Sequence, residues 1–168
     1  MLTLKRHARI VPSSVAAYYS TNFDTTENPI SESGVWQHLG TDRQNVETGS
    51  GYAYTPLFQA GYDDAYAYIA PSYKTFAADQ EVTTVVRKAS GYSPAGSHES
   101  EILLRVSDTS STFKAYECQL RHSGFIQIVY LDGGIGTFTD ITGTTTGVTP
   151  VDSDVFRARI VGSNITCY

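Results

Sequence analysis

The sequence predicts an all-β protein, a β-sandwich of antiparallel sheets with an extended N-terminal arm. The first observation is size, because 168 residues, 40% of them apolar, are enough for one domain with a core. The second is composition: 20 Thr and 12 Tyr favour strands, while 17 Ser and 14 Gly favour turns. The third is spacing, because short alternating stretches are separated by turn signals at intervals of roughly 8–12 residues. These observations argue against a helical bundle.

The first part of the chain combines an arm with short elements. Residues 1–16 show no clear periodicity and form the predicted arm, and residues 17–168 form the predicted domain. The composition of the next segments predicts short strands at 17–23, at 35–39 around Trp36 and at 43–48, with a long polar loop at 24–34.

A tyrosine-rich stretch covers residues 52–73. Tyr66 and Tyr68 are two positions apart, so a strand places them on the same face of a sheet. A helix through 63–69 is the alternative that this stretch leaves open.

The second half of the chain contains the clearest strands. Within 100–107, alternation predicts a strand with two distinct faces. One face has Ile102, Leu104 and Val106, and the other has Glu101, Leu103 and Arg105. Similar patterns and the turns between them predict strands at 80–88, 100–107, 112–121, 125–131, 136–142, 155–161 and 164–168.

The order of these elements resembles concanavalin A-like, or laminin G-like, jelly-roll domains of bacterial and phage type, across most of residues 19–168. The resembling stretches are STNFDTTENPISESGVW, VTTVVRKASG, ILLRVSDTSSTFKAYECQLRHSGFIQIVYLDGGIGTFTDI and DVFRARIVGSNITCY. The resemblance implies a jelly-roll sandwich. The superfamily includes lectins, glycan-binding modules, glycoside hydrolases, polysaccharide lyases and virion attachment parts, so the fold alone selects no function.

One departure from the family concerns the last strand. In such domains the strand corresponding to 164–168 continues into a turn and at least one more strand, whereas this sequence stops at Tyr168. Backbone groups that normally pair would then be open. The arm, a neighbouring chain or further residues of a longer product could complete the sheet. We therefore expect a homo-oligomer or a larger assembly, with an interface that includes Lys5, Arg6, Arg9, Ile165 and Tyr168.

A polar row is the first candidate site. If 100–107, 112–121 and 125–131 are neighbouring strands, their pleat brings acidic, basic and amide side chains together, and such groups can bind sugar hydroxyls. An ordinary solvent-facing sheet surface is the alternative. The residues expected in this row are Glu101, Arg105, Glu117, Gln119 and Arg121, and Gln127 joins or opposes them depending on register.

Aromatic residues form the second candidate site. Trp36, Tyr66 and Tyr68 are expected to contribute to a stacking platform for sugar rings, with core packing or a protein interface as alternatives.

Enzyme motifs related to this fold are incomplete. The lyases have an Arg-x-Glu-x-Arg strand and a Gln-x-His strand, whereas here Gln119 and His122 are three positions apart and would lie on opposite faces. Glu99 and Glu101 could flank a glycosidic bond, but Ser100 stands between them where the glucanases have Asp, and two acids at the start of a strand are usually solvated. We therefore expect a non-catalytic structural or adhesion domain, such as a virion surface or decoration component that contacts a glycan or a neighbouring subunit. A polysaccharide-active lyase or glycoside hydrolase is the alternative.

Charge and targeting signals narrow the location and the partners. The net charge of −5 makes nucleic acid an unfavourable partner of the whole domain. Lys5, Arg6 and Arg9 could dock the arm on an acidic neighbour or a nucleic acid, and a frayed, solvated terminus is the alternative. No stretch approaches the length of a membrane span, and the first residues lack the apolar run of a signal peptide. We expect cytoplasmic synthesis and a final location in a virion or outside the cell after release.

The sequence predicts no cofactor and leaves two chemical questions open. Asp63, Asp64 and Asp132 are loop acids of the kind that hold calcium, but neither cluster is dense. Cys118 and Cys167 lack the spacing of a zinc site. They could form a disulfide in an oxidising compartment, or Cys118 could serve as a small buried hydrophobe.

Overall fold

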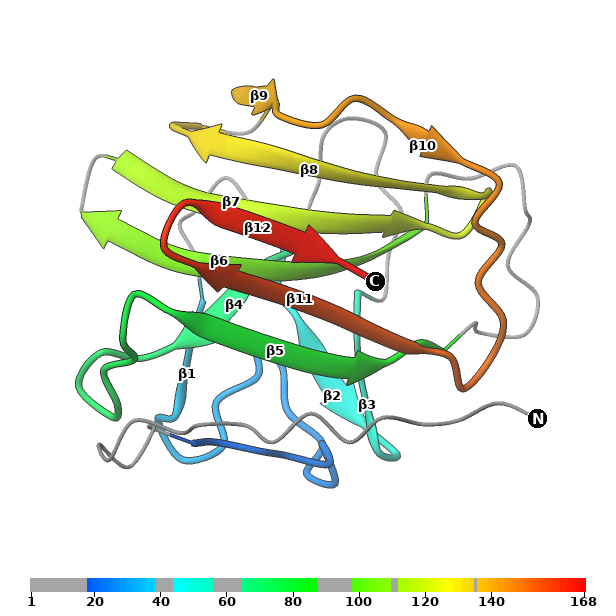
Figure 1. Ribbon diagram of the computed structural model, residues 1–168. Helices are drawn as coiled ribbons and strands as arrows, with labels where there is room; N and C mark the ends of the chain where they lie inside the picture. The colour runs from blue at the N-terminus through cyan, green and yellow to red at the C-terminus, as the bar shows by residue number, and fades with distance from the viewer. Residues whose placement is uncertain (1–17, 39–43, 56–64, 88–97, 110–111, 135) are drawn as a thin grey trace, which may run out of the picture.

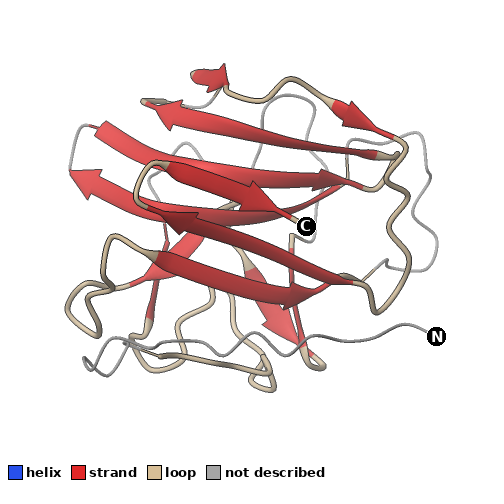
Figure 2. Cartoon of the chain, viewed as in Figure 1, coloured by secondary structure: helices blue, strands red, loops and turns tan. Residues whose placement is uncertain are grey.

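The computed structural model describes residues 18–38, 44–55, 65–87, 98–109, 112–134 and 136–168, and these residues form strands and loops without a helix (Figures 1 and 2). The all-β prediction is therefore confirmed in the described part of the chain. The strands are β1 (Trp36–His38), β2 (Glu47–Gly49), β3 (Tyr52–Tyr54), β4 (Ala67–Ile69), β5 (Gln80–Val85), β6 (Glu99–Thr109), β7 (Thr112–Arg121), β8 (Phe125–Asp132), β9 (Phe138–Asp140), β10 (Thr145–Thr146), β11 (Val155–Val161) and β12 (Asn164–Cys167).

Two antiparallel sheets form the sandwich-like body. The five-stranded sheet has the order β10-β8-β7-β6, with β9 paired to the same edge of β8 as β10. The three-stranded sheet has the order β12-β11-β5 and lies in front of it in Figure 1. Gly124 has φ 112° in the turn between β7 and β8, a conformation that glycine adopts without steric strain.

The main hydrophobic core lies between these sheets. Its central side chains are almost fully buried: Leu104, Cys118 and Phe156 have exposed fractions of 0%, 0% and 2%. Cys118 of β7 and Cys167 of β12 form a disulfide across this core, so the two sheets are covalently joined. This settles the question that the sequence left open for the cysteines.

A second core lies on the opposite face of the five-stranded sheet. Tyr66, just before β4, packs there with Phe113, Val129 and Leu131. β4 pairs with β1, and β2 pairs with β3, in two separate two-stranded sheets. The five-stranded sheet is therefore the middle layer of the molecule where β4 covers it.

Several expected elements differ from the structure. The described part of the expected strand 17–23 pairs with no strand, because the side chains of Tyr19 and Thr21 bond to Glu32 instead of the backbone joining a ladder. The alternative helix through 63–69 is wrong over its described residues, where β4 forms. The stretches 43–48 and 136–142 contain shorter strands than expected, and the expected loop 143–152 contains β10.

In the described segments, no helix is long and apolar enough to cross a membrane.

Candidate functional site

Part of the predicted polar row lies together at one end of the five-stranded sheet. Glu101 of β6 pairs with Gln119 of β7, and Gln119 pairs with Gln127 of β8. Residues that are direct cross-strand partners share a face, so these three side chains cross three neighbouring strands in one line. The register therefore places Gln127 with the row, which the sequence could not decide.

Glu99 organises the neighbouring positions of this row. Its carboxylate accepts hydrogen bonds from Gln119 and from the guanidinium of Arg121, whose Nε lies 2.5 Å from Glu99 Oε1. The Arg121 guanidinium also lies over the ring of Phe125, 4.2 Å from the ring centroid. Because the Glu99 side chain is only 12% exposed, this ion pair is shielded and the Arg121 head is held in one place.

Two other predicted sugar contacts are parts of the second core. Glu117 is 3% exposed and accepts a hydrogen bond of 2.8 Å from the Tyr66 hydroxyl, which is 3% exposed as well. This pairing satisfies two polar groups that burial would otherwise destabilise. In this conformation both side chains stabilise the interior and present almost no surface to a ligand.

Tyr68 lies on the same side as Tyr66, as its spacing predicted, and remains partly accessible. Its hydroxyl donates a hydrogen bond of 3.0 Å to the carboxylate of Asp108. Burial, followed by the bond to Asp108 and its negative charge, raises the pKa of Tyr68 to about 12. The phenol is thus a neutral donor that is already engaged.

The expected place of Arg105 in the polar row is wrong. The β6–β7 register shifts between Leu104 and Ser107, and Arg105 has φ 50°, so β6 bulges at this point. The bulge directs the Arg105 guanidinium to the three-stranded sheet, where it donates to the carbonyls of Ala78 and Gly162. Simple alternation fails here because the bulge inserts one extra residue.

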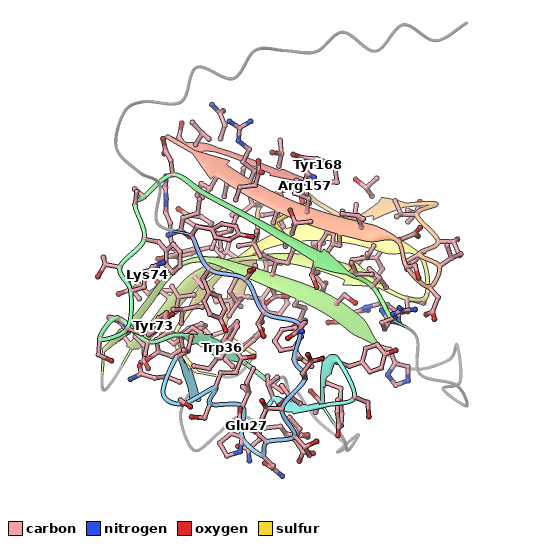
Figure 3. All side chains as sticks on the ribbon, turned by 90° about the horizontal axis from the view of Figure 1, so that it is seen from below. Glu27, Trp36, Tyr73, Lys74, Arg157 and Tyr168 are labelled. Atoms are coloured by element: carbon pink, nitrogen blue, oxygen red, sulfur yellow. A yellow bond between two sulfur atoms is a disulfide. The ribbon has the colours of Figure 1, made fainter. Side chains whose placement is uncertain are left out.

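Trp36 belongs to a separate aromatic cluster. Its indole Nε1 donates to Glu32 at 2.9 Å and lies 3.0 Å from the Tyr19 hydroxyl. The rings of Trp36 and Tyr73 contact Tyr19 edge-on, with centroid distances of 5.8 Å and 6.0 Å. This cluster therefore fixes where the chain enters the domain from the arm; Figure 3 shows Trp36, Tyr73 and Lys74 gathered on one side of the molecule.

The strand β12 forms one edge of the three-stranded sheet. Among the described strands only β11 pairs with it. The amide and carbonyl of Tyr168 both bond to Arg157 beside it, with N–O distances of 2.9 Å and 2.7 Å. Because backbone direction alternates along a strand, Thr166 also faces β11, while the amides and carbonyls of Ile165 and Cys167 face away from it. This open row of four backbone groups is called the β12 edge below.

The surface beside the β12 edge is partly apolar. The three-stranded sheet ends at β12, whereas β8, β9 and β10 of the five-stranded sheet continue beyond it (Figure 1). Three of the inward side chains there are only partly buried, whereas Ile128 of β8 is buried in the core. Tyr116 and Ile126 pack at the border of the core, and Tyr130 lies beside Tyr116 at 5.1 Å between ring centroids. One further strand next to β12 would cover these side chains.

The predicted interface residues divide between the described and the undescribed parts of the chain. Ile165 points to the core from the β12 edge and is half-buried. Tyr168 is 55% exposed, lies under the guanidinium of Arg157 and raises the pKa of that arginine (Figure 3). Lys5, Arg6 and Arg9 lie outside the described residues.

The expected calcium ligands are only partly described. Asp132 forms an ion pair with Lys114 at 3.0 Å, and the bond to Asp132 raises the pKa of Lys114. Within the described ranges, no three His, Cys, Asp or Glu side chains gather as a metal site would require. Asp63 and Asp64 lie outside these ranges.

The sequence interpretation missed two organising carboxylates. Glu99 was considered only with Glu101, although its cross-strand partner Arg121 signalled an ion pair. Glu32 lay in a stretch expected to be a plain polar loop, and no sequence pattern indicated that it would receive Tyr19, Thr21 and Trp36.

A scan against protein-family models found no match to this chain, and searches of curated proteins and of solved structures found no match either. The concanavalin A-like resemblance therefore stays a prediction, and function rests on the geometry of the described residues.

Proposed function

We propose that this protein is a non-catalytic structural domain that assembles with neighbouring subunits by adding a strand to the β12 edge. The single observation that carries this proposal is the coincidence of an open strand edge with a partly uncovered apolar surface. Ile165 and Cys167 direct their backbone groups outward, and Tyr116, Ile126 and Tyr130 lie beside them. An added strand would form hydrogen bonds with these backbone groups and would cover these side chains. Both contributions give strand addition its affinity.

The sandwich is rigid enough to support such an edge. The disulfide between Cys118 and Cys167 ties β12 to β7, so the acceptor strand is held in place before a partner arrives. Pre-organisation of this kind lowers the entropy loss of association. A jelly-roll arrangement in which the added strand completes the three-stranded sheet is the finer form of this proposal.

A location in a virion or outside the cell fits the same proposal. Structural disulfides persist in oxidising surroundings and are rare in reducing cytosol. The Cys118–Cys167 bond joins the two sheets through the core, as expected for a surface or decoration component that works after release.

Two lysine substitutions on β12 test the proposed function. Ile165 faces the core at the edge, so Ile165→Lys would place a charge beneath any added strand and should prevent assembly. Thr166→Lys adds the same charge to the exposed outer face, where an added strand leaves it in water. We expect light scattering to give masses above 18.3 kDa for the wild type and Thr166→Lys, and a monomer for Ile165→Lys.

Unfolding curves of both variants test whether Ile165→Lys remains folded, and we expect a cooperative transition for each. A wild type that stays at 18.3 kDa at every concentration would overturn the proposal. An assembly unaffected by Ile165→Lys would overturn it as well.

A glycan contact at the polar row is a second candidate function. The line of Glu101, Gln119 and Gln127 across three strands favours it, because carboxylate and amide groups at strand spacing can bind successive sugar hydroxyls. Binding to a glycan array that Gln127→Ala abolishes would support this function, whereas an array without binding would exclude it. Turnover of a polysaccharide would instead favour the lyase or glycoside hydrolase alternative.

A further inference from the structure

The arm and the β12 edge have complementary properties, and this inference about them rests on the proposed assembly function. We infer that the strand added to the β12 edge is the basic N-terminal arm, residues 1–16, of a second copy of this chain, so that copies join head to tail. Donor and acceptor are then different surfaces of one molecule, which makes the contact heterologous.

Charge favours the arm as the donor. The arm has Lys5, Arg6 and Arg9 and no acidic residue, which gives a charge of +3. The rest of the chain holds the other 9 of the 12 Lys and Arg against all 17 Asp and Glu, a net charge of −8. A basic segment is therefore attracted to the body of another copy, and this attraction steers the encounter.

The arm also has apolar residues at strand spacing. Although the arm as a whole lacks periodicity, Leu2 and Leu4 alternate with Thr3 and Lys5, as in a strand with one apolar face. Such a face matches the partly covered side chains of Ile126 and Tyr130 beside the β12 edge. An extended arm spans about 50 Å, so a few residues can pair with β12 while the remainder bridges the two copies.

The entry point of the arm lies away from the acceptor edge. Tyr19 packs on Trp36 and Tyr73, and Lys74 bonds to the Tyr18 carbonyl. Figure 1 shows residues 18–24 beyond β5, across the three-stranded sheet from β12. An arm that returned to its own β12 along the outer face of this sheet would have to cross both β5 and β11. A second copy meets the edge without this path.

The shape of the edge disfavours symmetric pairing of two β12 strands. β8, β9 and β10 extend past β12 (Figure 1), so the five-stranded sheets of two copies would overlap if their edges met. A single extended segment beside β12 would lie over this overhang without bringing a second five-stranded sheet to it.

A complementation experiment with full-length chains tests the inference. The donor variant carries Lys5→Glu, Arg6→Glu and Arg9→Glu, and its control carries Lys5→Arg, Arg6→Lys and Arg9→Lys, which keep the charge. The acceptor variant is Ile165→Lys. We expect the donor and acceptor variants each to be monomers of about 18.3 kDa, while their mixture forms a dimer of twice that mass, since one intact arm meets one intact edge.

Each outcome of this experiment has one meaning. A mixture that stays monomeric overturns the arm as donor, and so does a donor variant that assembles alone. If the donor variant assembles alone but Ile165→Lys is still a monomer, the arm is not the donor and the proposed assembly through the β12 edge remains supported. A control variant that fails to assemble would overturn the electrostatic argument, because its arm keeps the charge of +3.

Discussion

Two stretches of the same sheet face differ in how they are covered. Under β11 and β12, Leu104 and Cys118 are completely buried and lie among the side chains of the opposing sheet. On β8, Ile126 and Tyr130 occupy equivalent inward positions but are only partly buried, although Ile128 between them is buried. Both stretches show the same alternation of apolar and polar residues. The alternation therefore identifies the apolar face of a strand, whereas the topology determines whether another strand of the same chain packs on that face.

Removal of the disulfide between the two sheets should have the largest effect on the free energy of unfolding. Replacement of both Cys118 and Cys167 by Ala releases β12 from β7 and opens a loop of 49 residues in the unfolded chain. We expect the free energy of unfolding to fall by about 4 kcal/mol, as the loop-entropy relation gives for that length. Urea denaturation measures this loss, and a wild type treated with reductant is the matched control. An unchanged midpoint would contradict the role of the disulfide.

A pair of alanine variants compares the covered and open stretches directly. Leu104→Ala removes a fully buried side chain and should lower the free energy of unfolding by about 3 kcal/mol. Ile126→Ala should lower it by roughly half as much in the monomer, because its side chain already keeps some contact with water. Under assembling concentrations the effect of Ile126→Ala should grow while that of Leu104→Ala stays constant. Equal growth of both would remove the distinction between the stretches.

Tyr68 provides a smaller, pH-dependent test of the second core. Its pKa is raised to about 12 from the ordinary value of 10.0, so folding favours the neutral phenol. The associated stability is complete below pH 10.0 and is lost as the pH rises through about 12. We expect phenolate absorbance to show a late titration step that Tyr68→Phe removes. Loss of an earlier titration step in Tyr68→Phe would contradict this assignment.

Substitution of Glu27 should have the smallest effect on stability, and this effect should be seen at acidic pH. The backbone amides of Glu32 and Ser31 bond to its carboxylate and lower its pKa below the ordinary value of 4.5. The resulting stability is present above pH 4.5 and is lost as the pH falls through the lower folded-state pKa. Thermal unfolding of Glu27→Gln should therefore depend less on pH in this range than that of the wild type. Identical slopes for the two proteins would show that these amide bonds do not form.

Alternation and turn residues predicted the long strands well. The inward positions Leu104 and Cys118, the β7–β8 hairpin and the shared face of Tyr66 and Tyr68 followed from a period of two. The register followed from it only in part: Gln127 could not be placed until β8 was paired with β7. Local pattern therefore determines which face a residue occupies within a strand, and pairing determines its neighbours.

The failures have local physical causes. The bulge at Arg105 inverts one step of the alternation, and the sequence offers no glycine or proline that would mark it. The hydroxyls of Tyr19 and Thr21 find a carboxylate 13 and 11 residues away in Glu32, and this long-range contact replaces the expected strand. The burial of Glu117 against Tyr66 depends on a contact 51 residues apart, which a single sequence does not reveal.

The most direct test of the central claim is amide hydrogen exchange along β12, measured residue by residue at low and high protein concentration. The amides of Thr166 and Tyr168 face β11 and should be protected at both concentrations. We predict that the outward amides of Ile165 and Cys167 exchange fast in the dilute protein and become protected when it is concentrated. Fast exchange of both in the concentrated, assembled protein, or full protection of both at the lowest concentration, would contradict the account.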